Sequence, residues 1–265
     1  MELKMNIVAM ESFFEDLAKR SGDVIMPFFR TQINVSDKSK GTVFDPVTEA
    51  DRAAEFVIRT RIKEVFPSHG FLGEEFGEEN PDAEYVWVID PIDGTRSFVC
   101  GIPLWGTLIG LLKDQNPVYG VMHQPYTGET FFGDGKKATL KNAKGKRPLS
   151  VRPCESLSES YLMTTTPALF ETEKLSKYLS VERQTKLVRY GADCYAYMML
   201  ASGQIDLVIE TGLKPYDIMP LIPIIEGAGG IISNWNGGAV DGTGDIIAAG
   251  DRRVHAAALH ALNTL

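Results

Sequence analysis

The sequence contains few residues of the kinds that build disulfide frameworks or zinc sites. Its 265 residues include 3 cysteines and 4 histidines. The cysteines are Cys100, Cys154 and Cys194, which are widely spaced, odd in number and form no C-x-x-C pair. This pattern argues against a disulfide framework and a zinc knuckle, and it predicts a protein of a reducing compartment, the cytoplasm by default.

A long hydrophobic run and an excess of positive charge are also missing. No stretch approaches the roughly 20 apolar residues that span a bilayer, and residues 1–30 lack the apolar centre of a signal peptide. We therefore expect a soluble protein with no membrane partner. The formal net charge of -8 argues against nucleic acid as a partner and agrees with a protein that recruits cations.

What the chain does contain is the composition of a globular protein. Hydrophobic residues make up 44% and charged residues 23% of the sequence, which are ordinary values. A chain of this length can form one large domain or two closely packed ones. The pattern of elements changes near residue 150 without a visible linker, so we expect two halves, residues 1–150 and 151–265, that share an interface.

The first half begins with two amphipathic patterns. Apolar residues at helical spacing predict a long helix over Ile7–Phe29 and a second one from Pro46 to Val65, with Thr48 as its N-cap. Between them lies a polar segment, residues 34–44, which we expect to be a loop or a short hairpin.

Short β-prone runs follow the helices. They predict an antiparallel meander over residues 107–112, 118–123 and 129–133. A hairpin at 136–147 carries six Lys or Arg, and we expect it to be a solvated turn. The first half is therefore expected to be α+β.

The second half alternates strands and helices. The pattern predicts strands at 161–165, 186–189 and 205–210 and helices at 173–179 and 195–201. Later segments are a run over 218–226, strands at 231–232 and 246–249, and a helix over 252–262. Pro223 should remove an internal hydrogen bond from any helix over 218–226. This alternation predicts an α/β half.

The most informative stretch is an apolar, strand-like run that ends in two carboxylates. Asp90 and Asp93 follow Val86-Trp-Val-Ile89 and precede Gly94 and Thr95. Pro91 should stop further ladder pairing, and Gly94 allows a tight turn or a close approach to a ligand. Two neighbouring carboxylates repel each other unless a cation neutralises them, and oxygen ligands favour Mg²⁺ or Mn²⁺ over zinc. The alternative is a plain turn after a strand.

Two further acidic sites repeat this logic. Glu74 and Glu75 end a second short apolar run, 71–73, and would otherwise belong to a solvated loop. Asp51 lies in the first turn of the second predicted helix, where its alternative role is to interact with the helix dipole. A metal site without histidine needs such acids from more than one segment.

Taken together, several segments resemble the signature segments of the inositol monophosphatase family, in that family's order. They are Gly73-Glu-Glu75, Trp87-Val-Ile-Asp-Pro-Ile-Asp-Gly-Thr95, Lys214-Pro-Tyr-Asp217 and Glu226-Gly-Ala-Gly-Gly230. The segments Thr164–Phe170 and Tyr190–Tyr197, with the run from Leu200 to Asp217, are similar to the histidinol-phosphatase-like branch. The resemblance covers the chain from Lys40 to its end.

The resemblance implies a layered αβαβα sandwich, a homodimer and two or three Mg²⁺ ions, with Mn²⁺ as an alternative. Glu74, Asp90 and the Ile92 carbonyl would bind one ion. Asp90, Asp93 and Asp217 would bind a second, with Asp90 bridging, and a weaker third site would involve Glu74 and water.

The resemblance also implies an activity, hydrolysis of a phosphate monoester. Thr95, with Glu74 and Asp51, would orient the attacking water. The backbone N–H groups of Gly94 and Thr95, beside Asp93, would hold the phosphate if a helix begins there. Lys40 aligns with a lysine near the family's site, but it lies on a segment that we expect to move.

Substrate choice is expected from the side opposite the metals. Asp193 and Glu210 stand at the family's substrate-facing positions and would favour a cationic leaving group, as in L-histidinol phosphate. Asp193 has an alternative role as a helix N-cap, and Tyr195 and Tyr197 are expected in the core or at the rim. The competing substrate is inositol-1-phosphate, and a non-catalytic cation-binding regulatory protein is the competing class.

Overall fold

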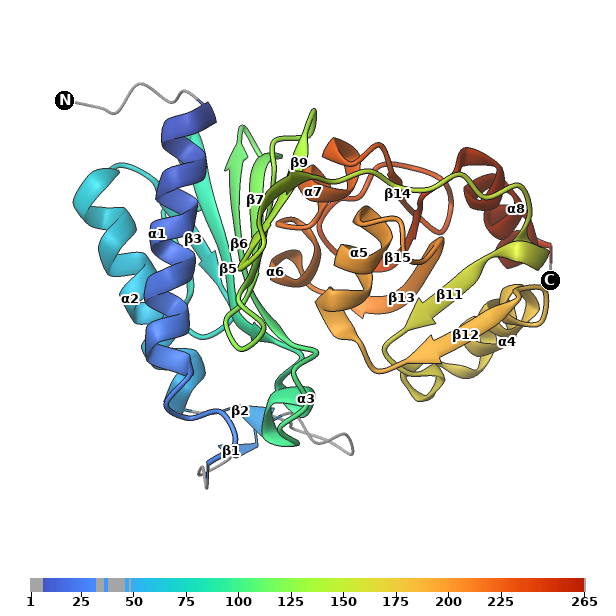
Figure 1. The fold of residues 1–265 in the computed structure, drawn as a ribbon, viewed down its shortest axis with the longest axis horizontal. Helices are drawn as coiled ribbons and strands as arrows, with labels where there is room; N and C mark the ends of the chain where they lie inside the picture. The colour runs from blue at the N-terminus through green and yellow to red at the C-terminus, as the bar shows by residue number, and fades with distance from the viewer. Residues whose placement is uncertain (1–6, 32–35, 38–45, 48, 265) are drawn as a thin grey trace.

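The structure is a computed structural model that describes residues 7–31, 36–37, 46–47 and 49–264. It has five layers (Figure 1): two helices, an eight-stranded sheet, a central helical layer, a five-stranded sheet and two outer helices. This is the αβαβα architecture that the family resemblance implies. Lys40, most of the 34–44 segment and the expected N-cap Thr48 lie outside the described residues.

The first layer consists of α1 (Ile7–Ile25) and α2 (Glu49–Val65). Between them, β1 (Ser36–Asp37) pairs antiparallel with β2 (Pro46–Val47). α1 ends four residues before the predicted Phe29, because Pro27 disfavours the helical conformation in the residue before it. Both helices bury apolar side chains against Trp87 and Ile89 of the sheet.

The eight-stranded sheet has the order β10-β9-β8-β7-β6-β5-β3-β4. Its strands are β3 (Gly70–Gly73), β4 (Gly77–Glu79), β5 (Tyr85–Asp93), β6 (Gly106–Lys113), β7 (Asn116–Gln124), β8 (Glu129–Gly133), β9 (Ala138–Asn142) and β10 (Gly145–Pro148). Every pair is antiparallel except β3 with β5. The predicted meander is therefore confirmed.

The basic hairpin β9–β10 is more than a solvated turn. Lys141 lies 2.7 Å from Glu15, and Lys146 lies 2.5 Å from Glu11. Both acids belong to α1, so the hairpin's positive charge is matched by the neighbouring helix.

The five-stranded sheet has the order β12-β11-β13-β15-β14. Its strands are β11 (Tyr161–Thr164), β12 (Leu187–Tyr190), β13 (Leu207–Leu213), β14 (Ile231–Asn234) and β15 (Gly244–Ala249). The first three strands in this order are parallel, and β15 is antiparallel to both of its neighbours. The α/β alternation predicted for this half is therefore confirmed.

The central layer contains α5 (Asp193–Ala201), α6 (Pro215–Ile218) and α7 (Ile222–Gly227), and the outer layer contains α4 (Thr172–Glu182) and α8 (Arg252–Asn263). Short 3-10 helices occupy Leu157–Glu159 and Pro167–Leu169. Pro223 removes no internal hydrogen bond, because it lies in the first turn of α7, where a backbone N–H has no acceptor within the helix.

The core is continuous between the two sheets. One cluster joins Leu108 and Met122 of the first sheet to Ile225 of α7 and to Val208 and Ala248 of the second sheet. None of the described helices is both long enough and apolar enough to cross a membrane.

Candidate active site

The two strand-end acids meet because β3 and β5 are parallel neighbours. Their register pairs Gly73 with Ile89, so the next residues along the two strands are Glu74 and Asp90. The Glu74 N–H donates to the Ile89 carbonyl over 3.1 Å, which extends the ladder to the site. Parallel strands end at the same edge of a sheet, and here that edge is acidic.

The alternation of side chains along β5 decides where Asp90 points. Trp87 and Ile89 face the first helical layer, whereas Val86 and Val88 face the central layer and pack near Met219. Asp90 continues the second set, because side chains two residues apart share a face of a strand. It is 2% exposed and faces the layer that contains α6.

The sequence suggested that Pro91 ends the pairing of this strand, but β5 continues past it. The strand continues to Asp93, and the pairing with β6 shifts between Asp90 and Asp93. The irregularity re-aims the side chains that follow it, as β-bulges often do beside active sites. Asp93 consequently turns toward the same space as Asp90.

The third carboxylate comes from the other half of the chain. Asp217 lies on α6, and its Oδ2 accepts the Lys214 N–H over 2.8 Å, which fixes the first turn of this short helix. One carboxylate oxygen from each of Asp90, Asp93 and Asp217 lies within 4.8 Å of the others. The three residues thus form a compact group of carboxylates that could hold a metal ion.

The electrostatics of this group require a cation or protons. Burial raises the pKa of Asp90 well above its usual range, and the nearby carboxylates of Glu74, Asp93 and Asp217 raise it further. Burial also raises the pKa of Asp93, with Asp193 and Asp217 adding to the effect. The pKa of Asp217 rises to about 7, mainly through burial. An all-oxygen donor set with unbalanced negative charge fits a hard divalent cation such as Mg²⁺.

The backbone between the aspartates is held by local hydrogen bonds. The Ile92 N–H donates to Asp90 Oδ1 over 3.1 Å, and the Thr95 hydroxyl donates to the Ile92 carbonyl over 3.0 Å. Gly94 has φ 87°, a conformation that glycine adopts without strain, and α3 (Thr95–Val99) begins directly after it. The helix start expected at Thr95 is therefore present.

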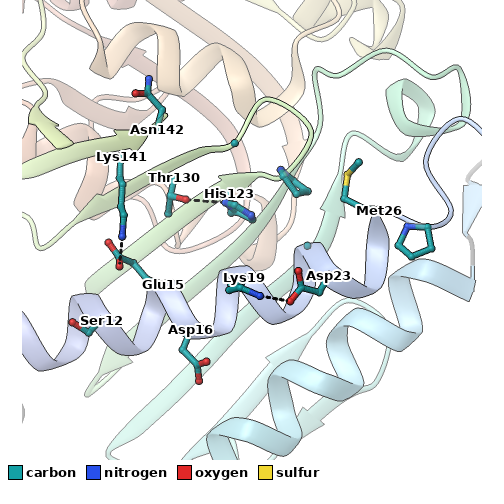
Figure 2. Close-up of a pocket in the computed structure, with 14 residues that line it drawn as sticks. Ser12, Glu15, Asp16, Lys19, Asp23, Met26, His123, Thr130, Lys141 and Asn142 are labelled. Carbon is teal, nitrogen blue, oxygen red and sulfur yellow. Dashed lines mark hydrogen bonds and ion pairs between the residues drawn. The ribbon is translucent and has the colours of Figure 1, made fainter. Parts of the chain in front are cut away.

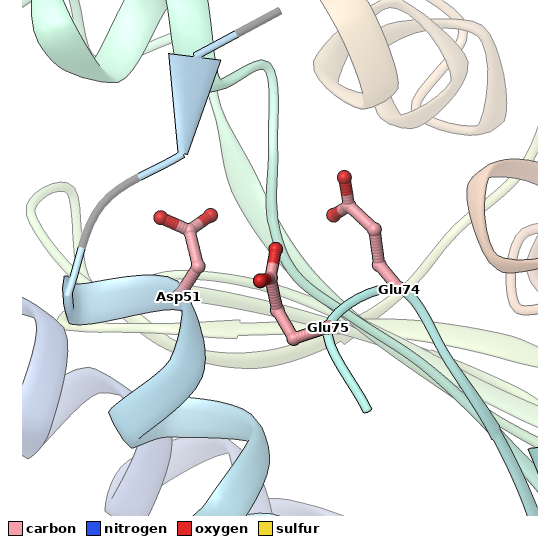
Figure 3. A group of neighbouring side chains, drawn as sticks. All are labelled: Asp51, Glu74 and Glu75. Carbon is pink, nitrogen blue, oxygen red and sulfur yellow. The ribbon is translucent and has the colours of Figure 1, made fainter. Parts of the chain in front are cut away.

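A second acidic group borders the first. Asp51, Glu74 and Glu75 each place a carboxylate oxygen within 4.8 Å of the other two. Figure 3 shows the three side chains side by side, with Asp51 coming from α2 and both glutamates from the turn after β3. Asp51 is 1% exposed, and the Glu75 side chain is 2% exposed and lies 3.5 Å from Arg52.

Glu75 was noticed in the sequence as part of an acidic pair but not assigned to the site. Consecutive residues of a regular strand point to opposite faces of the sheet. The turn after Gly73 removes that alternation, so the two carboxylates can share one region.

The predicted specificity residues meet at the carboxyl ends of the parallel strands of the second sheet. Asp193 follows β12 and Glu210 lies on β13, and together with Asp93, Asp217 and Thr165 they line one small cavity. Tyr197 is buried and also lines this cavity, whereas the Tyr195 hydroxyl donates to Glu129 over 2.5 Å.

Glu210 is almost fully buried and well supplied with donors. It accepts hydrogen bonds from the Thr165 N–H at 2.6 Å, the Thr165 hydroxyl at 3.0 Å and the Thr164 hydroxyl at 3.2 Å. Burial raises its pKa to about 8, although these hydrogen bonds lower it. Thr165 was not expected as a site residue, because nothing in its local sequence indicates Glu210 as a partner.

The N-cap role considered for Asp193 is wrong. The N-cap of α5 is Ala192, and Asp193 is the first helical residue, with φ 45°. Its carboxylate instead accepts the Ser97 hydroxyl over 3.0 Å. The next N–H, that of Cys194, donates to Asp93 Oδ2 over 2.6 Å. Asp193 is thus directed toward the acidic site.

A wide groove elsewhere on the molecule contains none of the predicted site residues. It runs between α1 and β7–β9 (Figure 2), and each lysine that lines it pairs with an acidic side chain that also lines it. Lys19 lies 2.6 Å from Asp23, and Lys141 lies 2.7 Å from Glu15. Among the described residues that line the groove, both lysines are therefore already paired with acids and are not free to bind a phosphate.

Comparison with known proteins shows the family to which the chain belongs. The model of the inositol monophosphatase family matches residues 7–265. The chain is 44% identical over 257 residues to "Bifunctional phosphatase IMPL2, chloroplastic" of Arabidopsis thaliana, covering 93% of this chain and 72% of that relative. It is 33% identical over 232 residues to a histidinol-phosphatase of Chlorobaculum parvum, covering 86% and 88%. A solved inositol monophosphatase from Zymomonas mobilis matches with a TM-score of 0.85 at 38% identity, covering 95% and 96%.

Proposed function

We propose that this chain, which belongs to the inositol monophosphatase family and is a phosphatase, acts on L-histidinol phosphate. The products would be L-histidinol and phosphate. The observation that carries the proposal is the pair of carboxylates, Asp193 and Glu210, that line one cavity with Asp93 and Asp217. A leaving group with an ammonium group complements that pair, whereas an inositol ring offers only hydroxyls.

The acidic groups support the metal assignment that the family resemblance implies. We assign Glu74, Asp90 and the Ile92 carbonyl to one Mg²⁺, and Asp90, Asp93 and Asp217 to a second, with a weaker third site at Glu74. Bound Mg²⁺ lowers the pKa of a coordinated water and neutralises charge on the phosphate and the leaving oxygen. The compact Asp90, Asp93 and Asp217 group and its raised pKa values agree with this assignment.

The protein's own groups would position the reactants. The Thr95 proton is directed to the Ile92 carbonyl, so the Thr95 oxygen is left to accept a hydrogen bond from the attacking water. Glu74 and Asp51, which lie in one acidic group, would orient the same water. The backbone N–H groups of Gly94 and Thr95, beside Asp93, would hold the phosphate at the start of α3.

Inositol-1-phosphate is the second candidate substrate. Glu210 can accept a hydrogen bond from a ring hydroxyl as readily as from an ammonium group, and the Arabidopsis relative bears the name bifunctional phosphatase. Asp193 favours the amine over the inositol ring, because a carboxylate forms a stronger hydrogen bond with an ammonium group than with a hydroxyl.

A panel of kcat/KM values tests the proposal. L-histidinol phosphate, inositol-1-phosphate and fructose-1,6-bisphosphate are compared in Mg²⁺, with EDTA as the metal control. We expect L-histidinol phosphate to have the highest kcat/KM and EDTA to remove phosphate release from every substrate. A preference for inositol-1-phosphate would establish the second candidate. Absence of release from all three would favour the non-catalytic, cation-binding class.

We also propose an oligomeric state, a division of the chain into two halves and a location for this protein. They are a homodimer, a division of the chain into residues 1–150 and 151–265, and a cytoplasmic location. The name of the Arabidopsis relative includes the word chloroplastic, so an organelle is the alternative compartment. Sedimentation measures the first, limited proteolysis the second and cell fractionation the third.

A further inference from the structure

The hydroxyl of Ser97 contacts the residue to which we assign substrate choice. Ser97 lies on α3, and its hydroxyl donates to Asp193 Oδ2 over 3.0 Å, across 96 positions of sequence. Both residues are partly buried, so water competes less for this hydrogen bond than it would at the surface.

The start of α3 also packs directly on Asp193. A Cβ added at Gly94 would lie 3.0 Å from Asp193 Oδ2 and 3.1 Å from its Cγ, so no larger residue fits there without displacing the carboxylate. Asp193 itself has φ 45°, in the left-handed region that residues other than glycine rarely adopt. An unfavourable backbone conformation persists where surrounding contacts impose it, and such positions cluster at functional sites.

The Asp193 carboxylate is held from more than one side. Burial raises the pKa of Asp193, and the Ser97 hydrogen bond and the positive charge of Arg96 partly offset this rise, whereas the Thr165 hydroxyl donates to Glu210. One residue further on, the Cys194 N–H donates to Asp93 Oδ2 over 2.6 Å. The two contacts run in opposite directions and join the end of β5 and α3 to the start of α5.

We infer that Ser97 is a positioning residue that fixes the Asp193 carboxylate relative to Asp93, so that a substrate's cationic group and its phosphate are held at a set separation. The inference rests on the proposed function, because it takes Asp193 as a substrate contact. Ser97 itself need not touch the substrate. Its effect should therefore disappear when Asp193 can no longer bind the cationic group.

A double-mutant cycle tests this dependence. Ser97→Ala, Asp193→Asn and the double variant are assayed on L-histidinol phosphate, with Ser97→Thr as the variant that keeps the hydroxyl. We expect Ser97→Ala to raise KM about five-fold, the effect of losing one hydrogen bond, while kcat changes less than two-fold. Ser97→Thr should restore most of the affinity, and Ser97→Ala should add nothing in the Asp193→Asn background.

Ser180→Ala is the matched control. Its hydroxyl is also partly buried and lies within hydrogen-bond distance of the Lys177 carbonyl, at 2.6 Å, and the Ala261 carbonyl, at 2.9 Å, but it is on α4, away from the site. We expect wild-type KM and kcat for this variant. Additive effects of Ser97→Ala and Asp193→Asn, an unchanged KM for Ser97→Ala, or a fall in kcat alone would each overturn the inference.

The same cycle on inositol-1-phosphate separates this inference from the proposed function. A wild-type protein that cleaves only inositol-1-phosphate would contradict the proposed substrate. The cycle on that ester then decides the role of Ser97. Coupling between the two substitutions in KM supports positioning of Asp193, and its absence overturns it.

Discussion

Glu74 and Asp90 stand beside each other because the parallel register of β3 and β5 pairs Gly73 with Ile89, the residues directly before them. The residues next to them in the sequence do not by themselves bring these two side chains together. The Glu74 carboxylate contributes to raising the pKa of both Asp90 and Asp217. The register of one strand pair therefore creates the excess negative charge that a cation would neutralise.

Replacing Asp90 with Asn should abolish turnover without unfolding the protein. The amide has the same shape but removes the buried negative charge shared by both assigned metal sites. We expect kcat/KM to fall by about 10³-fold or more, because metal-assisted hydrolysis depends on the ligand set. The metal-free variant should melt no lower than the metal-free wild type, since it loses repulsion from three carboxylates. Near-normal activity in this variant would refute the metal assignment.

Mg²⁺ should stabilise the folded protein. An ion that binds the folded state at about 100 times its Kd contributes about 2.7 kcal/mol to the free energy of unfolding, which corresponds to a rise in Tm of roughly 5–10 °C. Thermal melts with Mg²⁺ and with EDTA measure this difference. The difference should shrink in Asp217→Asn, because this variant lacks one ligand of the compact group. An equal Mg²⁺ effect in both proteins would place the ion elsewhere.

Asp193→Ala should change substrate preference more than overall activity. Loss of a charge-assisted hydrogen bond to an ammonium group weakens binding by about 2 kcal/mol, or roughly 30-fold. We expect kcat/KM for L-histidinol phosphate to fall by this factor and that for inositol-1-phosphate to fall less. Steady-state kinetics on the two esters measure the ratio. Equal losses on both esters would remove Asp193 from the specificity argument.

The stability of the protein should decrease below pH 6.5 through His123. Burial lowers the pKa of His123 to about 4, although the Glu129 carbonyl and Asp23 partly offset the effect. The ring is therefore neutral in the folded state, while in the unfolded chain it binds a proton below about pH 6.5. The unfolded state gains protons in this window, so the stability present above pH 6.5 is lost as the pH falls toward 4, by at most about 3 kcal/mol.

Urea unfolding at several pH values measures this loss, with His123→Gln as the comparison. The ring Nδ1 lies 2.9 Å from the Thr130 hydroxyl, and glutamine retains a polar group for such a contact. We expect a smaller loss between pH 7 and pH 5 in the variant. Carboxylates titrate in both proteins, so only the difference between the two curves reports on His123. Parallel curves would contradict a His123 that stays neutral in the folded protein.

Much of the fold follows from local patterns. The helical spacing before Phe29 predicts α1, and the alternation after residue 150 predicts the α/β half with its strands and helices. The errors have local causes as well. Pro27 ends α1 early, Pro91 is accommodated by a shift in pairing, and Pro223 falls in the first turn of α7. In each case the sequence marked a special position but did not show how the neighbouring element would accommodate it.

The sequence likewise predicted some of the site residues and missed others. The apolar runs before Asp90 and Glu74 identify both as strand-end acids. From these two acids the sequence by itself predicts a cluster of oxygen ligands. Asp217 entered through the family resemblance, because no periodicity joins it to β5. Glu75 was noticed only as part of an acidic pair with Glu74, and the contact between Ser97 and Asp193 was not foreseen.

Local sequence determined which segments become strands and which strands end in a carboxylate, because side-chain alternation and turn residues act over a few positions. Only the tertiary structure decided which strand ends meet. The register of β3 with β5, and the convergence of β11, β12 and β13 at one edge, depend on pairing between distant segments. That pairing is set by how whole faces bury their apolar side chains, so it cannot be derived from any one segment alone.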